Sequence, residues 1–175
     1  CNFPPIEGYE KYIGKKADYH FFNAHDPNPY EQKTLNELGL KEIYNTHHVP
    51  HPGYKTSFPE HNVIYDPEYG QRTVREIKER YGFHPSTGTQ AFYFFVQNPS
   101  YDKIGLVGID YFKVGQRGYY YPPSEVQQSL RYLYSRSGDT PFDAEGVRVQ
   151  ENSHDSEKTR LFVEEMSRMY GKTVE

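Results

Sequence analysis

The sequence predicts an α/β protein with a Rossmann-like, mostly parallel sheet that carries helices on both faces. The order of the expected elements leads to this prediction, and chain length and aromatic content indicate how many domains to expect and what fills the core. Segments with strand character alternate with segments of helical periodicity in the order βαβαβ. The chain has 175 residues, enough for one hydrophobic core, so we expect a single domain over 1–175. Aromatic residues make up 17% of the chain, and we expect Tyr and Phe to fill much of that core.

Strands and helices are expected to alternate through the first half of the chain. An aromatic strand over 17–23 runs into an Asn-Ala-His-Asp-Pro turn. A helix over 31–41 follows it, and then come strands over 42–48 and 61–66. The next helix, over 71–83, spaces apolar residues at helical intervals and ends at a glycine, and these residues are Val74, Ile77, Tyr81 and Gly82.

The second half begins with a buried helix over 89–97 and a buried strand over 103–112. The sequence then becomes rich in Gly, Tyr and Pro, and we expect 113–153 to form an ordered lid segment with a helix over 124–137 inside it. A last helix over 156–172 stops at Gly171, and its apolar stripe consists of Phe162, Met166, Met169 and Tyr170.

Charge and composition exclude several classes of function. The chain has 24 acidic and 20 basic residues, a net charge of −4 and no dense run of Lys or Arg, so we expect no nucleic-acid partner. Its one cysteine, Cys1, excludes an internal disulfide and a thiolate metal cluster, which favours a reducing, cytoplasmic compartment. No apolar stretch reaches the roughly 20 residues of a transmembrane helix. Peripheral membrane contact and a homo-oligomer stay open.

The segment "HPSTG" is typical of a helix start, and its function can be interpreted in two ways. Pro85 suits the residues before a helix, Ser86 or Thr87 can cap the first turn, and Gly88 lets backbone approach a ligand closely. Free N–H groups at a helix start also bind anions such as phosphate. The local pattern fits an ordinary capped helix as well as an anion site.

The expected strand over 103–112 has a Gly-Ile-Asp tripeptide near its end, in which Gly108 is the first residue and Asp110 the last. In open α/β sheets ligands bind at the carboxyl ends of strands, so Asp110 is a candidate ligand contact, or a residue that caps a turn. Three tyrosines follow in the lid segment, Tyr119, Tyr120 and Tyr121, and their hydroxyls can either donate to an anion or lie at a packed surface.

Histidines suggest two further sites. His47, His48 and His51 lie close together, but no carboxylate accompanies them at a recognised metal-ligand spacing, so we expect no metal. His154 lies in a polar loop just before the last helix, where a reachable imidazole can act as a general base near neutral pH. The same position also fits an exposed loop histidine, or a histidine that helps to cap the helix.

Several signatures are missing from the chain. It has no Walker A motif, no Gly-x-Gly-x-x-Gly, no His-Glu-x-x-His and no Gly-x-Ser-x-Gly. It also has no Asp-x-Asp pair, the feature with which sugar transferases that use nucleoside diphosphates commonly hold a divalent ion.

Four blocks in order resemble the small bacterial sialyltransferases that transfer from CMP-sialic acid. They are "CN" with "YIGKKADYHFFN" at the start, "STG" at 86–88, "GID" at 108–110, and "NSH" with "FVEEM" around 152–166. The "PSTG" turn is also similar to a sialyl motif of eukaryotic Golgi sialyltransferases, but those enzymes depend on a disulfide that a chain with one Cys cannot form.

The resemblance implies an inverting, metal-independent glycosyltransferase with a glycosyltransferase A-like fold and no cofactor. It implies a CMP-sialic acid donor, or a related CMP-activated ketose, and a glycan or glycolipid acceptor near 113–153. His154 would be the general base. The residues that the resemblance places at the donor are Asn2, Asn23, Ser86, Thr87, Gly88, Gly108, Asp110, Tyr119 and Tyr121.

The chain departs from the family pattern at three places. The family begins with a strand and a Gly-Asn-Gly-Pro-Ser turn that would precede Cys1. His84 replaces an acceptor-side Arg, and Phe112 replaces a Tyr. These departures keep a second hypothesis open, a nucleotide-binding or scaffolding domain of the same fold that does not catalyse transfer.

Overall fold

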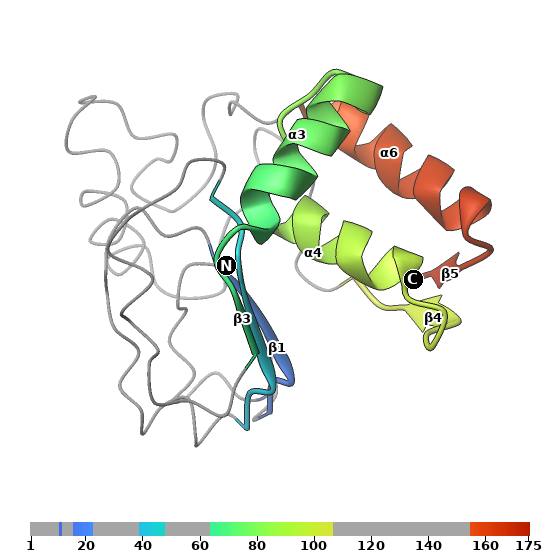
Figure 1. Ribbon diagram of the computed structural model, residues 1–175. Coiled ribbons are helices and arrows are strands. Elements are labelled where there is room, and N and C mark those ends of the chain that lie inside the picture. The colour runs from blue at the N-terminus through green and yellow to red at the C-terminus, as the bar shows by residue number, and fades with distance from the viewer. Residues whose placement is uncertain (1–10, 12–15, 23–38, 48–63, 107–154) are drawn as a thin grey trace, which may run out of the picture. The chain divides into compact units, whose positions relative to one another are not determined.

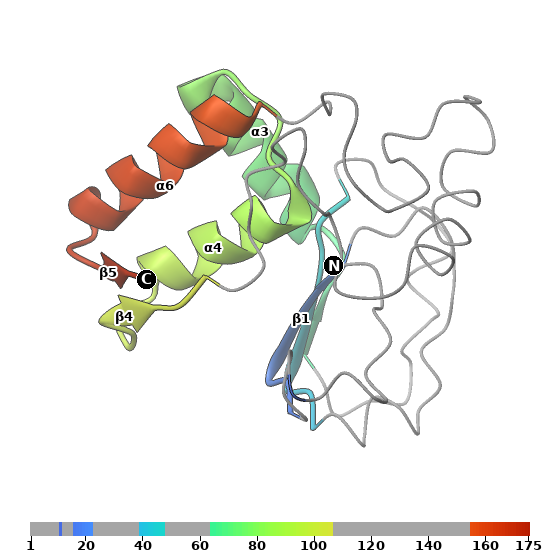
Figure 2. The ribbon, with the colours of Figure 1, turned by 180° about the vertical axis from the view of Figure 1, so that it is seen from behind.

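A computed structural model of the protein describes residues 11, 16–22, 39–47, 64–106 and 155–175 (Figure 1 and, from behind, Figure 2). The chain divides into two compact units, Cys1–Gly82 and Phe83–Glu175. Both units contain helices and parallel strands, so the protein is mixed α/β. The expectation of a single domain over 1–175 stays a prediction. No helix in the described part of the chain is long and apolar enough to cross a membrane.

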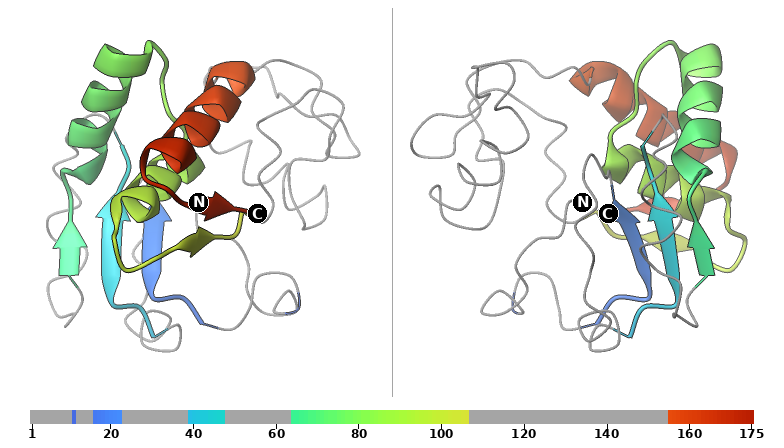
Figure 3. Two further views of the ribbon diagram at one scale, coloured as in Figure 1. Left: turned by 90° about the vertical axis from the view of Figure 1, so that its right-hand side faces the viewer. Right: turned by 60° about the vertical axis from the view of Figure 1, so that its left-hand side comes forward.

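The first unit contains a parallel sheet of three strands. These are β1 (Tyr19–Phe22), β2 (Glu42–Asn45) and β3 (Ile64–Asp66), in the spatial order β1-β2-β3 (Figure 3). The register places Phe21 beside Tyr44, and Tyr44 beside Asp66. The three strands fall where the sequence predicts them and pair in parallel as expected, although each is shorter than its predicted range.

Helix α3 (Tyr69–Tyr81) begins on an aromatic cluster at the sheet. Its first residue, Tyr69, contacts the stacked rings of Phe21 and Tyr44 edge-on, with centroid distances of 5.7 Å and 5.1 Å. The stacked rings are themselves 4.9 Å apart. Burial raises the pKa of the Tyr44 and Tyr69 hydroxyls above the ordinary value for tyrosine. One aromatic cluster therefore joins β1, β2 and the start of α3.

The second residue of α3, Gly70, lies against the backbone that follows β2. A Cβ atom at this position would be 2.2 Å from the carbonyl carbon of Thr46 and 2.6 Å from the carbonyl oxygen of His47. Backbone atoms cannot move aside as the end of a flexible side chain can. Glycine is therefore required here by the close approach of helix and strand.

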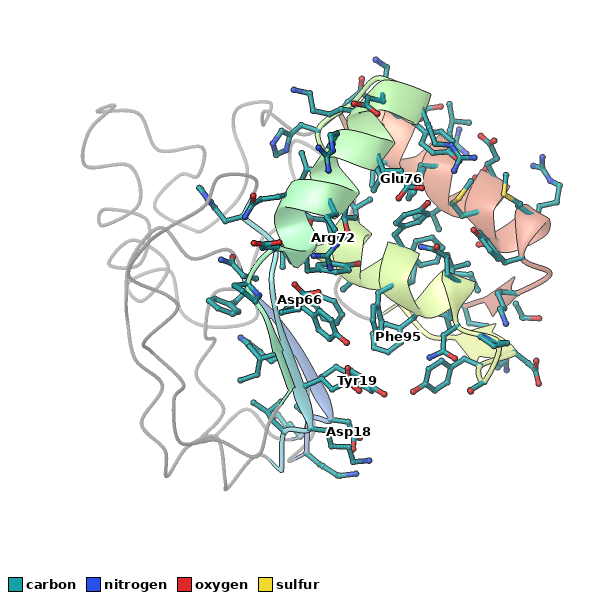
Figure 4. The ribbon with its side chains drawn as sticks, viewed as in Figure 1. Asp18, Tyr19, Asp66, Arg72, Glu76 and Phe95 are labelled. Atoms are coloured by element: carbon teal, nitrogen blue, oxygen red, sulfur yellow. The ribbon has the colours of Figure 1, made fainter. Side chains whose placement is uncertain are left out.

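The turn between β3 and α3 is held by Asp66 and its two partners. The Asp66 carboxylate accepts the backbone N–H of Glu68 at 3.0 Å and forms an ion pair with Arg72, one turn into the helix (Figure 4). Helix α3 then buries Thr73, Val74 and Ile77 and ends before Gly82, whose φ is +70°. The predicted helix over 71–83 is confirmed, with its start two residues earlier.

The start of the sheet is fixed by Asp18, which bonds to the chain before β2. Its carbonyl oxygen accepts the backbone N–H groups of Lys41 and Glu42, at 2.8 Å and 3.1 Å. Its exposed carboxylate pairs with Lys41 and Lys16, which together lower its pKa. The last three residues of the helix predicted over 31–41 are not helical, because Gly39 turns with a φ of +66° and leads into β2. Residues 31–38 lie outside the described part.

The second unit is built on two packed helices, α4 (Thr87–Gln97) and α6 (Ser156–Met169). Phe162 of α6 lies between Tyr93 of α4 and Phe83, with ring centroids 5.5 Å and 5.6 Å away. Val96 of α4 and Met166 of α6 are also fully buried. Burial of a side chain as large as Phe162 contributes about 2–3 kcal/mol, so this contact is a main stabilising element of the unit.

A two-stranded parallel sheet joins the segment after α4 to the segment after α6. Strand β4 (Lys103–Ile104) pairs with β5 (Thr173–Val174), and the backbone N–H of Leu106 extends the pairing to the Glu175 carbonyl at 2.7 Å. The strand predicted over 103–112 is thus only two residues long where it is described. Residues 107–112 lie outside the described part. The sequence did not indicate β5.

Helix α6 ends in a glycine turn, as predicted. Gly171 has a φ of +63°, and the N–H of Lys172 reaches back to the carbonyl of Ser167 at 2.8 Å, a Schellman pattern. The apolar stripe predicted for this helix is only half right, because Met169 and Tyr170 are 54% and 37% exposed. Tyr170 follows the last helical residue, Met169, so the helical periodicity does not extend to it. Thr159 and Val163 complete the buried stripe instead.

Replacing Gly70 by Ala should destabilise the protein by about 1–3 kcal/mol, because the added methyl group overlaps backbone atoms of Thr46. The matched control is Gly105→Ala, since no atom lies within 4 Å of a Cβ built at Gly105. The control should change the free energy of unfolding by less than about 0.5 kcal/mol. Urea unfolding measures both, and equal stabilities for the two variants would contradict the proposed close approach.

The imidazole of His20 should make stability depend on pH. His20 lies on β1 beside Phe22, and burial lowers its pKa to about 3, from an ordinary value of 6.5. Between these values the unfolded chain binds the proton and the folded chain does not, so stability is full above pH 6.5 and falls as the pH drops toward 3. The loss is at most about 1.4 kcal/mol per pH unit. Unfolding of wild type and His20→Phe at pH 7 and pH 4.5 tests this, since only wild type should show the added loss.

Truncating Phe162 to Ala should cost about 3–5 kcal/mol, because it empties the space between Tyr93 and Phe83. The neighbouring Leu161→Ala is the control on the same helix, since Leu161 is 48% exposed. We expect the control to cost less than about 1 kcal/mol. Thermal or urea unfolding gives both values, and similar losses would show that Phe162 is not a core residue.

Candidate functional site

The "HPSTG" segment forms the start of helix α4, and Ser86 is its cap. Ser86 has an extended backbone (φ −73°, ψ 169°), and its Oγ accepts the backbone N–H of Thr89 at 3.1 Å. The Oγ also lies 2.9 Å from the Thr89 hydroxyl, and both residues are buried. Pro85 before the cap is buried as well. Of the two residues predicted as the cap, Ser86 fills this role, and Thr87 is the first residue of the helix.

Two backbone N–H groups in the first turn of α4 donate hydrogen bonds to Ser86. The amides of Thr89 and Gln90 donate to the side chain and the carbonyl of Ser86, respectively. Thr87 and Gly88 are half-buried at the first two helical positions. No acidic side chain lies in the first turn, so the positive end of the helix dipole is not offset by a carboxylate of that turn. The Ser86 hydroxyl serves the helix, and the turn suits an anion electrostatically.

The start of helix α6 is capped by Asp155, a residue that the sequence analysis did not single out. Asp155 Oδ1 accepts the backbone N–H of Lys158 at 2.9 Å, and its carbonyl accepts the Thr159 hydroxyl at 2.7 Å. An Asp directly before the helical pattern is the signal that would have identified the cap. His154 precedes this cap and lies outside the described residues. Asp155 is thus the N-cap of α6, and the interpretation that His154 helps to cap this helix stays a prediction.

Most of the predicted site lies in parts of the chain that the structure does not describe. This holds for the candidate base His154, for the lid segment 113–153, and for the donor residues Asn2, Asn23, Gly108, Asp110, Tyr119 and Tyr121. Asn23 directly follows Phe22, the last residue of β1. Ser86, Thr87 and Gly88 are therefore the predicted site residues that the structure places.

Polar residues also gather at the carboxyl ends of β2 and β3, a place where open α/β sheets bind ligands. Asn45 and Thr46 are buried there, and Asp66 ends β3. The hydrogen bonds and the ion pair described for these residues are made with other residues of the first unit. The Asn45 side-chain oxygen accepts the His47 N–H at 3.0 Å, the Thr46 N–H donates to Phe22 at 2.8 Å, and Asp66 pairs with Arg72. These contacts hold the strand ends and the start of α3 together.

The described residues contain no group of three or more His, Cys, Asp or Glu side chains that could hold a metal ion. Of the three clustered histidines, His47 follows β2, and His48 and His51 lie outside the described part. Among protein-family models, curated proteins and solved structures, none matches this chain.

Removing the cap by Ser86→Ala should destabilise the protein by about 1–2 kcal/mol, because the buried N–H and hydroxyl of Thr89 lose their partner. Ser86→Thr keeps the hydroxyl and should recover most of this loss. Equilibrium unfolding in urea compares the variants with wild type. A Ser86→Ala protein as stable as wild type would show that the hydroxyl does not cap α4.

Proposed function

We propose that the protein is a glycosyltransferase that transfers sialic acid, or a related CMP-activated ketose, to a hydroxyl of a glycan or glycolipid. The observation that carries the proposal is the order of four sequence blocks, which follows the order in the small bacterial sialyltransferases. These blocks contribute Asn2 and Asn23, the turn 86–88, the strand end 108–110, and His154. The finer fold, a Rossmann-like sheet of the glycosyltransferase A-like kind, belongs to the same proposal.

Two structural features support the proposal at the level of local geometry. The turn 86–88 opens an 11-residue helix whose first turn has no acidic residue, which favours a phosphate there. Strands β1 to β3 are parallel, and Asn23 follows the carboxyl end of β1, where ligands bind in open α/β sheets.

The proposed reaction is a single displacement with inversion. The oxygen of the acceptor hydroxyl attacks the anomeric carbon and forms the new glycosidic bond. The bond from that carbon to the phosphate oxygen breaks, and CMP leaves with the electron pair. His154 Nδ1 or Nε2 accepts the proton of the hydroxyl. The sugar carries positive charge in an oxocarbenium-like transition state.

Negative charge develops on the departing phosphate, and donors must stabilise it. Tyr119 and Tyr121 would donate their hydroxyl protons, and the helix start at Thr87 and Gly88 would add its partial positive charge. A leaving monophosphate carries less charge than a diphosphate, so this chemistry can proceed without a divalent ion. The absence of an Asp-x-Asp pair from the sequence agrees with such a mechanism.

One of the three departures from the family pattern concerns the acceptor. His84 replaces the Arg that the family uses on the acceptor side, so we expect a different acceptor preference. A glycolipid acceptor would bring the enzyme to a membrane surface, and that contact would be peripheral.

Replacing His154 by Ala should lower the rate of transfer about 10²- to 10⁴-fold while CMP binding stays unchanged, because only the proton acceptor is lost. The full protein is incubated with CMP-sialic acid and a mixed glycan acceptor, released CMP is measured, and CMP affinity is determined by calorimetry. His51→Ala is the control, since His51 has no role in the proposed reaction, and it should transfer at the wild-type rate.

The outcomes separate the alternatives. Unchanged transfer by His154→Ala would remove this residue from the mechanism. Wild-type protein that binds CMP but never releases it from CMP-sialic acid would favour a nucleotide-binding or scaffolding domain. Wild-type protein that binds neither CMP nor CMP-sialic acid would overturn both hypotheses. Stoichiometric metal that is lost in His51→Ala would instead support a histidine metal site.

A further inference from the structure

We draw no further inference here: the strongest candidate, the exposed face of helix α6 that carries Leu161 and Met169, is an unpartnered apolar surface, and nothing in the structure shows what covers it.

Discussion

The close approach of helix α3 to the end of strand β2 sets the arrangement of the first unit. Gly70 lies directly on the backbone after β2, at a distance that leaves no room for a Cβ atom. The preceding Tyr69 packs on Phe21 and Tyr44, which belong to two neighbouring strands. A change at Gly70 would therefore disturb the aromatic cluster as well, because the two residues are adjacent in one helical turn.

Polar contacts at the same place reinforce this arrangement. Asp66 binds both the N–H of Glu68 and the side chain of Arg72, which fixes the direction in which α3 leaves the sheet. Exposed ion pairs alone contribute little to stability, typically about 0–1 kcal/mol. The Asp66 pair is better regarded as a constraint on the turn, while apolar burial at Val74 and Ile77 supplies most of the stabilisation.

The start of α4 shows how one local geometry serves two interpretations. A Ser cap stabilises a helix start, and the absence of an acidic residue from the first turn leaves the positive end of the helix dipole open to an anion. The buried bond between Ser86 and Thr89 makes the first turn rigid. A rigid turn would present Thr87 and Gly88 to a phosphate without a further ordering cost, so the structural role of Ser86 is compatible with the proposed function.

The sequence predicted best those features that depend on residues a few positions apart. The ends of α3 and α6 at Gly82 and Gly171, and the start of α4 at Ser86, follow from short-range hydrogen bonds and from the backbone angles that glycine allows. The positions of β1 to β3 follow from local apolar pattern, and their parallel pairing was predicted from the order of elements. Of the candidate site, the same reasoning reached the cap at Ser86 and missed the one at Asp155.

Tertiary contacts decided what no local pattern contains. The pairing of β4 with β5 joins residues about 70 positions apart, and strands of two residues have no periodicity to detect. The need for glycine at position 70 arises from the backbone of Thr46, which the sequence does not place nearby. Met169 is exposed although the sequence places it on the apolar stripe of α6, because an apolar side chain by itself does not determine burial. The sequence alone determined the ends of α3 and α6 and the cap of α4, because hydrogen bonds and glycine backbone angles within one turn fix those points. Packing between distant segments determined which residues became core.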